Sequence, residues 1–212
     1  MLKRKQDYQI KEAKFIQQVK VMRLFIALNF SPHLKHRIGL LLKELQDLPI
    51  DCKWVEPENL HLTLKFIGEV EGNLIHDLVQ VLERLADDFE PWEVEIKGSG
   101  VFPHWRRPRV VWLGVQAPPG LFLFQKTLAQ ELEKLPLSLD QKPFVPHITL
   151  GRLRLERNVE LLQKKIQPLA KEVWGTEVIK SVELMESRLT PKGALYSVRS
   201  SIPLRGKTEP EP

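Results

Sequence analysis

The feature that most constrains the fold of this chain is a tetrapeptide that occurs twice. Segment 61–64 reads His-Leu-Thr-Leu, and segment 147–150, which starts 86 residues later, reads His-Ile-Thr-Leu. A β-strand alternates its side chains, so in each copy His and Thr point to one face, about 6.6 Å apart along the strand. The sequence therefore predicts two strands that each present an imidazole and a hydroxyl on one side.

The residues around the tetrapeptides repeat at the same spacing. Without gaps, prolines, an arginine and apolar positions match 86 residues apart: Arg23 with Arg109, Pro32 with Pro118, Pro57 with Pro143, Leu24 with Val110, Phe25 with Val111, Ile38 with Phe124 and Leu42 with Leu128. Such a constant spacing indicates two copies of one supersecondary unit. The alternative is chance recurrence of a short strand motif, and the matching prolines and helix positions weigh against it.

Local hydrophobic patterns give both copies the same order of elements. Apolar runs predict strands, and apolar residues spaced three or four apart predict helices. We expect strands at 23–29, 60–67, 93–96, 110–115, 146–153, 177–189 and 194–202, and helices at 32–45, 74–85, 121–132 and 161–169. Alternating strands and helices are typical of an α+β or an α/β arrangement.

Composition narrows the class of protein. With 212 residues, 42% of them hydrophobic and 28% charged, the chain is long enough for one large domain or two small lobes that share a core. No apolar run approaches the roughly 18 residues that a membrane span needs, so we expect no membrane association. Cys52 is the only cysteine, which excludes an intrachain disulfide and fits a cytoplasmic location.

The positive charge is concentrated at the N-terminus. Residues 1–21 carry six basic side chains against two acidic ones, and so hold four of the five net positive charges. The sequence pI of about 9.3 is therefore weak support for nucleic-acid binding by the remainder. We expect a basic extension at 1–21, a two-lobed domain at 22–204 and a disordered tail at 205–212; Met22 is an alternative start.

Two of the six histidines stand out because they occupy equivalent positions. One neutral imidazole can take a proton from water while a protonated one gives a proton to a departing oxygen. His61 and His147 are therefore the candidate catalytic pair. The other four histidines have no cysteine or carboxylate cluster at ligand spacing, so we expect them at exposed positions, with no metal and no cofactor.

Hydroxyl and guanidinium groups near the histidines complete a candidate phosphate site. Thr63 and Thr149 lie two residues after each histidine, and Arg152 is the nearest arginine to the second copy. These groups can bind non-bridging oxygens as negative charge develops. Strict alternation would turn Arg152 away from His147, but a bulge at Gly151 would turn it back.

The paired motifs resemble the two-histidine phosphoesterase superfamily. The flanking segments 22–27, 54–70, 108–115 and 143–152 are similar to those of the RNA 2′,3′-cyclic phosphodiesterase family, historically called 2′-5′ RNA ligase. The resemblance extends over residues 22–204. It implies a bilobal α+β fold, a pseudo-twofold duplication in which two antiparallel sheets face a central cleft with the helices outside.

The resemblance also implies an activity and roles for residues. It implies metal-independent hydrolysis of an RNA 2′,3′-cyclic phosphate to a 2′-phosphate, and reversible ligation that forms 2′-5′ linkages. His61 would protonate the leaving 3′-oxygen and His147 would activate water. The residues that would hold the phosphate are Thr63, Thr149 and Arg152.

The expected partner is RNA with a cyclic phosphate end, tRNA fragments included, bound by a monomer. Phe144 or Trp54 would stack on the terminal base.

Two other functions are compatible with the same residues. One is a phosphodiesterase that acts on small cyclic nucleotides or 2′-5′ oligonucleotides, which a comparison of RNA ends with free nucleotides would distinguish. The other is a non-catalytic RNA-end binder, against which the intact histidine and threonine of both motifs argue.

Overall fold

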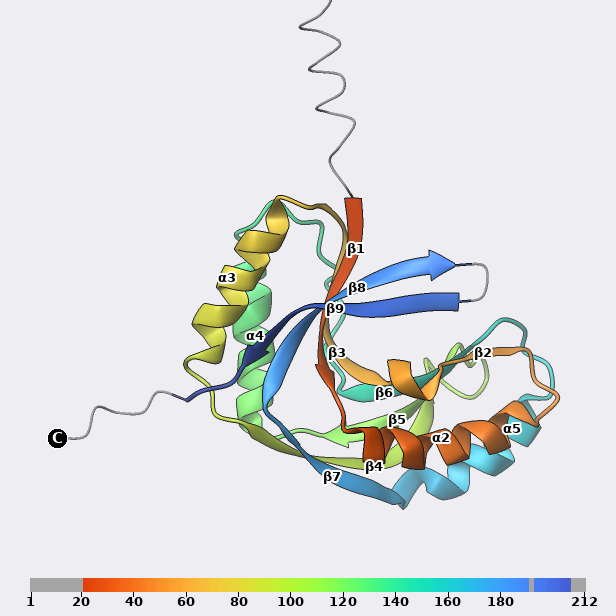
Figure 1. The fold of residues 1–212 in the computed structure, drawn as a ribbon. Helices are drawn as coiled ribbons and strands as arrows, with labels where there is room; N and C mark the ends of the chain where they lie inside the picture. Colours follow the sequence, from red (N-terminus) through yellow and green to blue (C-terminus); the bar gives the residue numbers. More distant parts are fainter. Residues whose placement is uncertain (1–20, 191–192, 207–212) are drawn as a thin grey trace, which may run out of the picture.

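The structure is a computed structural model that describes residues 21–190 and 193–206. Most of the expected basic extension and residues 207–212 of the expected tail lie outside these ranges. The described residues form strands, α-helices and two 3₁₀ helices (Figure 1): β1 (Val21–Asn29), α2 (Pro32–Gln46), β2 (Cys52–Trp54), η1 (Pro57–Asn59), β3 (His61–Glu71), α3 (Leu74–Ala86), β4 (Trp92–Phe102), β5 (Val110–Gln116), α4 (Pro119–Leu132), β6 (His147–Leu153), α5 (Val159–Ile166), η2 (Gln167–Lys171), β7 (Val173–Ile179), β8 (Ser181–Thr190) and β9 (Gly193–Pro203).

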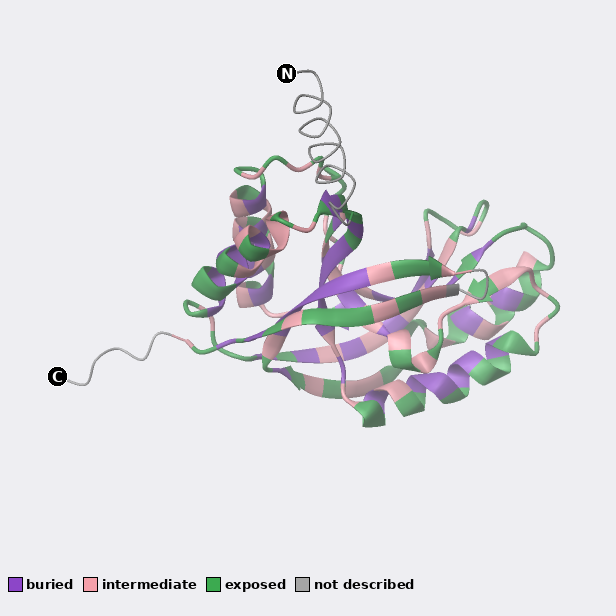
Figure 2. Cartoon of the chain, turned by 45° about the horizontal axis from the view of Figure 1, so that its top comes forward, coloured by how far each residue is buried: buried purple, intermediate pink, exposed green. Residues whose placement is uncertain are grey.

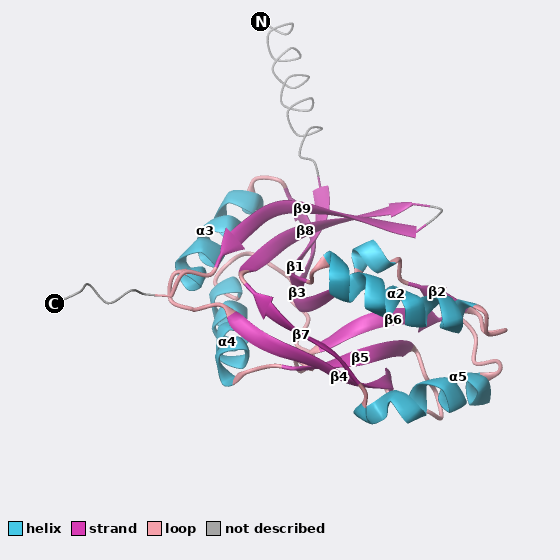
Figure 3. Ribbon diagram, turned by 60° about the horizontal axis from the view of Figure 1, so that its bottom comes forward, coloured by secondary structure: helices cyan, strands magenta, loops and turns pink. Residues whose placement is uncertain are grey.

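The strands form one curled antiparallel sheet in the order β7-β4-β5-β6-β3-β1-β8-β9, with β2 added beside β6 (Figure 3). The order reads the same from both ends when β1 is exchanged with β5, β3 with β6, β4 with β8 and β7 with β9. The pseudo-twofold duplication and the α+β class are therefore confirmed. The two expected sheets are the two halves of one sheet, joined where Leu62 of β3 pairs with Ile148 of β6.

The helices cover the two halves in exchanged pairs. Helices α3 and α4 lie side by side at one half, and α2 and α5 lie together at the other (Figure 1). An ion pair joins each helix pair, Arg84 with Glu131 and Glu44 with Lys165. The first helix of each repeat thus packs with the second helix of the other repeat, which interlocks the two copies.

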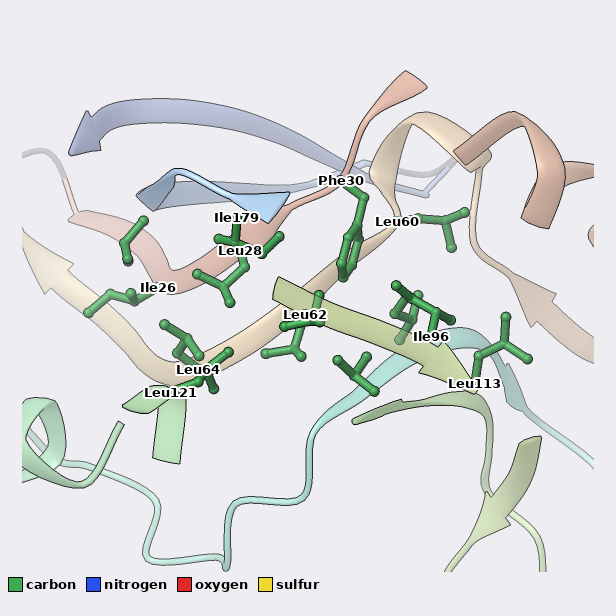
Figure 4. Close-up of a cluster of buried hydrophobic side chains, with 14 of the residues drawn as sticks. Ile26, Leu28, Phe30, Leu60, Leu62, Leu64, Ile96, Leu113, Leu121 and Ile179 are labelled. Carbon is green, nitrogen blue, oxygen red and sulfur yellow. The ribbon is translucent and has the colours of Figure 1, made fainter. Parts of the chain in front are cut away.

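The two halves share one hydrophobic core. Figure 4 shows Leu62 among side chains from both halves, with Leu28 and Leu64 from one and Ile96 and Leu113 from the other. Buried positions alternate with exposed ones along several strands and form one stripe of each helix (Figure 2). This is the pattern expected for strands and helices that each bury one face.

The first strands of the two repeats match with a spacing of 85 residues rather than 86. Asn29 lies opposite His61, whereas Gly114 lies opposite His147. The fully buried Leu28 therefore corresponds to Leu113. A slip of one residue exchanges the two faces of a strand, so the predicted strand matches of residues 24 and 25 with 110 and 111 were wrong. The helix positions 38 and 42 keep the spacing of 86, because Ile38, Leu42, Phe124 and Leu128 are all buried.

The expected strand at 177–189 is two strands. β7 ends at Ile179 and pairs with β4, whereas β8 begins at Ser181 and pairs with β1. The chain crosses from one half of the sheet to the other at Lys180, and local hydrophobicity carries no sign of that change of partner.

The chain is also hydrogen-bonded to the rest of the fold at both ends of the described ranges. Val21 pairs with Glu71, so β1 begins one residue before the expected boundary. At the other end, the Arg205 N–H donates to the Ala86 carbonyl, and the Gly206 N–H to the Phe89 carbonyl.

Candidate active site

His61 opens strand β3 directly after the short helix η1. Its Nδ1 lies 2.7 Å from the carbonyl oxygen of Asn59, and its Nε2 lies 3.1 Å from Oγ1 of Thr63. A carbonyl oxygen only accepts, so Nδ1 carries the proton and donates it. In the neutral imidazole Nε2 is then the acceptor, and the Thr63 hydroxyl donates to it.

His147 opens strand β6 with the same local geometry. Its Nδ1 lies 2.7 Å from the carbonyl oxygen of Val145, two residues before it, as Asn59 is before His61. Both histidines are therefore held in one tautomer by their own chain, and both leave Nε2 for chemistry. The contact of Nδ1 with the carbonyl two residues earlier is thus repeated in both copies of the tetrapeptide.

The register between β3 and β6 brings the two motifs together. Leu62 pairs with Ile148, and both side chains are fully buried in the core. If that antiparallel register is continued by one residue each way, His61 lies across from Thr149, and His147 lies across from Thr63. All four therefore lie on the face opposite the core. His61 and His147 are diagonal neighbours across the two strands, and the Cα atoms of such neighbours lie about 7–8 Å apart.

Arg152 reaches the same face because of a bulge in β6. Opposite β5, Trp112 pairs with Thr149 and Val110 pairs with Arg152, so β6 advances three residues while β5 advances two. Directly paired residues point to one side, and the bulge therefore returns Arg152 to the side of Thr149. We call the face that carries His61, Thr63, His147, Thr149 and Arg152 the histidine face.

Gly151 is required for this bulge because β2 packs closely there. A Cβ at Gly151 would lie 2.6 Å from both Sγ of Cys52 and the ring of Trp54. The expectation of a bulge at this glycine is thus confirmed by the register and by the close approach of β2.

Aromatic rings flank each imidazole. The His61 ring lies 4.9 Å from that of Phe25 and meets Tyr196 edge-on at 5.3 Å, and the His147 ring meets Phe102 edge-on at 5.0 Å. These contacts restrict the orientation of the imidazoles and remove part of their surface from water.

Burial and nearby positive charge favour neutral imidazoles in the free protein. The pKa of His61 is lowered to about 4, mainly by burial and also by the charge of Lys35, against the hydrogen bond to Asn59, which raises it. The pKa of His147 is also lowered, first by burial and then by Arg152, against the bond to Val145. The charges of His147 and Arg152 also lower the pKa of His61. This agrees with the strand register, which places both residues near His61.

Of the two expected stacking residues, Trp54 points away from the histidine face, and Phe144 packs against a helix. Trp54 pairs with Gly151, so its side chain points to the opposite side from Arg152, and its ring covers the glycine. Phe144 packs edge-on against Phe122 of α4, with ring centres 5.9 Å apart. Neither contact supports a role in stacking on a base, because strand register turns Trp54 inward and the loop before β6 directs Phe144 to a helix.

Sequence reasoning missed several residues around the imidazoles. Phe25 lies in a continuous apolar run, and Phe102 and Tyr196 are distant in sequence from both motifs. Lys35, on the first turn of α2, donates from Nζ to the carbonyl of Glu58 at 2.8 Å. Only strand pairing and helix packing bring these residues to the histidines, so no local signal identifies them.

Among the described residues, no group of three or more His, Cys, Asp or Glu side chains is arranged to hold a metal ion. Within the same part of the chain, no helix is long and apolar enough to cross a membrane.

A family model and curated relatives point to the same protein family. Residues 39–183 match the family model described as the 2′-5′ RNA ligase superfamily. A Methanothermobacter thermautotrophicus protein named RNA 2′,3′-cyclic phosphodiesterase is 35% identical over 176 residues, which are 83% of this chain and 95% of that protein.

Solved structures share the fold. A Thermus thermophilus protein, TT0787, superposes with a TM-score of 0.76 at 27% identity, over 88% of this chain and 100% of its own. E. coli LigT, solved in complex with 3′-AMP, superposes with a TM-score of 0.71 at 24% identity, over 87% of this chain and 99% of its own. The second likeness concerns the fold alone.

Proposed function

Because the chain belongs to the 2′-5′ RNA ligase superfamily, we propose that it hydrolyses the 2′,3′-cyclic phosphate at an RNA end to a 2′-phosphate without a metal ion. The observation that carries the proposal is the symmetry of the histidine face. His61 and His147 each donate Nδ1–H to a backbone carbonyl two residues earlier, which leaves both Nε2 atoms for proton transfer. Curated relatives are named for this hydrolysis.

The reaction needs one proton removed and one supplied. Neutral His147 takes a proton from the attacking water through Nε2, and protonated His61 gives a proton from Nε2 to the leaving 3′-oxygen. No bond between phosphorus and the protein is required. The phosphorus–3′-oxygen bond breaks, and the 2′-phosphate remains on the ribose.

We infer the leaving oxygen from family membership, because the pseudo-symmetric geometry serves either polarity. If the 5′-hydroxyl of a second RNA replaces water while the 3′-oxygen leaves, the same chemistry forms a 2′-5′ linkage. The family name and a 2′-phosphate product therefore require the same leaving oxygen. We assign the acid role to His61 and the base role to His147.

The remaining groups of the histidine face bind the phosphate. The hydroxyls of Thr63 and Thr149 donate to its non-bridging oxygens, and the Arg152 guanidinium supplies positive charge. A bound phosphate anion favours the imidazolium form, which opposes the lowering of the pKa by burial. Substrate binding thus prepares the protonated histidine that the free protein disfavours.

Incubation of an oligoribonucleotide bearing a 2′,3′-cyclic phosphate with the protein and excess EDTA tests this function. We expect complete turnover, with a 2′-phosphate identified by ³¹P NMR. A 3′-phosphate product would contradict the assigned roles, and loss of turnover that one divalent metal restores would contradict the metal-free mechanism.

We propose further that the protein acts as a monomer in the cytoplasm, on RNA ends that include tRNA fragments. We also propose that a chain beginning at Val21 folds and hydrolyses a dinucleotide cyclic phosphate, because Val21 is the first residue paired in the sheet. Failure of that shortened chain to fold would assign residues 1–20 to the domain.

A further inference from the structure

We propose that Lys53, beside Arg152, binds the internucleotide phosphate that precedes the terminal nucleotide, and so gives the protein a preference for oligonucleotide ends over mononucleotides. This inference rests on the proposed function and extends the site by one nucleotide. It assigns a role to strand β2, which pairs with β6 outside the main strand order of the sheet.

The register brings Lys53 to the histidine face. In the pairing of β2 with β6, Lys53 lies directly opposite Arg152 and Trp54 opposite Gly151. Directly opposed residues point to one side with Cβ atoms about 4.5–5.5 Å apart, so Lys53 shares the side of Arg152. Both side chains are exposed. Strands β2 and β3 pair with the same edge of β6, one after the other. Lys53 therefore lies on the same side of β6 as His61.

The two cations lack the acidic partners that neighbouring arginines have. Two residues further along the same strand pair, Arg154 lies 3.8 Å from Asp51, and Arg109 of the adjoining loop lies 3.3 Å from Glu156. Within the described residues, no ion pair or side-chain hydrogen bond is formed by Lys53 or Arg152. On its other side, Arg152 faces Val110, which supplies no charge.

Like charges directly opposite each other on paired strands destabilise a sheet. Cys52 and Trp54 approach Gly151 so closely that a Cβ would not fit there, which favours the register that places Lys53 opposite Arg152. An anion bound between Lys53 and Arg152 would remove that cost. Since Arg152 lies next to Thr149 and acts electrostatically on both histidines, such an anion is adjacent to the reacting phosphate.

The other half of the site lacks this charge, which gives the RNA a direction. The residue equivalent to Arg152 in the first repeat is Phe66, whose side chain also lies on the face of His61 and is 48% exposed. Its ring lies 6.0 Å from that of Phe25. At the equivalent strand positions of the histidine face, the β6–β2 side thus carries cations where the first repeat carries an aromatic ring, and the phosphodiester backbone enters from the β6–β2 side.

The experiment compares a trinucleotide ending in a 2′,3′-cyclic phosphate with cytidine 2′,3′-cyclic phosphate. The variants are Lys53→Gln, which removes the charge, and Lys53→Arg, which keeps it. Lys126→Gln is the matched control, because it removes an exposed lysine from α4 at the other half of the sheet.

We expect the ratio of kcat/KM for the trinucleotide to that for the mononucleotide to fall about fivefold in Lys53→Gln. Lys53→Arg and Lys126→Gln should keep the ratio of the wild-type protein. The logarithmic dependence of trinucleotide binding on salt should become shallower by about 0.7 in Lys53→Gln, the value for one phosphate contact on a single strand.

A ratio in Lys53→Gln within twofold of the wild-type ratio would overturn the proposal. So would a parallel loss on both substrates with a lower melting temperature, which would make Lys53 structural; we expect a melting temperature at or above that of the wild-type protein. If the wild-type protein opened neither substrate, the proposed function itself would be wrong, whatever Lys53 does.

Discussion

At the scale of single residues, the two histidines are alike in their own backbone contacts and different in their surroundings. Each donates Nδ1–H to a carbonyl two residues earlier. His61 in addition lies against Phe25 and Tyr196 and near the charge of Lys35, and burial lowers its pKa to about 4. The pseudo-twofold symmetry therefore supplies two equivalent bases, and the environment makes them unequal.

Replacement of either histidine should remove most of the activity. If the pair acts as acid and base, His61→Ala and His147→Ala should each lower kcat by about 10²–10⁴-fold. The double variant should lose far less than the product of the two, because the residues act as a unit. His76→Ala, on the exposed face of α3, is the control and should keep full activity. A folded single variant with near-normal turnover would contradict the assignment.

The charge of Lys35 should be measurable through the pKa of His61. Lys35→Met removes that charge, so the pKa of His61 should rise from about 4 but stay below its ordinary value, because burial is the larger cause. NMR titration of the imidazole measures this directly. Lys35→Arg should leave the pKa low, and an unchanged His61 titration in the methionine variant would show that Lys35 has no electrostatic effect.

At the scale of elements, short strand β2 and the bulge in β6 convert a symmetric pair of motifs into an asymmetric site. The bulge returns Arg152 to the histidine face, and the packing of β2 on Gly151 holds the bulge in place. The equivalent bulge in β3 puts Phe66 on that face instead. Equivalent bulges in the two strands thus place Arg152 on the histidine face in one half and Phe66 on it in the other.

The bulge should depend on glycine at position 151. Gly151→Ala would bring a Cβ within 2.6 Å of Cys52 and Trp54. We expect a loss of about 1–3 kcal/mol in the free energy of unfolding and a lower kcat/KM, since relief of the clash displaces Arg152. Gly120→Ala is the control, because its Cβ would come no closer than 3.3 Å, to the indole of Trp92. Denaturant titration and steady-state kinetics test both, and equal activity in the two variants would argue against the role of the bulge.

At the scale of the whole molecule, the two repeats form one folding unit. The exchanged helix pairs and the shared core mean that neither half can bury its apolar surface alone. The junction at Leu62 and Ile148 is also the place where the histidine face forms. The site is therefore built on the part of the sheet that both halves stabilise.

The buried neutral imidazole of His61 should make the fold sensitive to acid. The unfolded chain binds a proton near pH 6.5, whereas the folded protein resists it until about pH 4. Stability is thus fully present above pH 6.5 and is lost as the pH falls toward 4, by up to about 3 kcal/mol from this residue. Chemical denaturation at several pH values should give a smaller loss for His61→Gln; an equal loss in both proteins would refute the linkage.

The sequence by itself determined the duplication, the helices and the candidate residues. Repeated tetrapeptides, matching prolines such as Pro32, and apolar spacing are local signals, and local physics suffices to interpret them. The histidines, threonines and Arg152 came from those signals together with the family resemblance, and even the bulge at Gly151 was visible as a glycine that breaks the alternation.

Only the tertiary structure decided which face each strand presents and which elements meet. The first strands match at 85 rather than 86 residues, Trp54 turns inward, and Lys35, Phe102 and Tyr196 reach the imidazoles from distant segments. These outcomes depend on register and on which strands pair. Register is a long-range property. A shift of one residue changes little in an isolated strand, but in a sheet it moves the side chains of the strand from the core face to the solvent face.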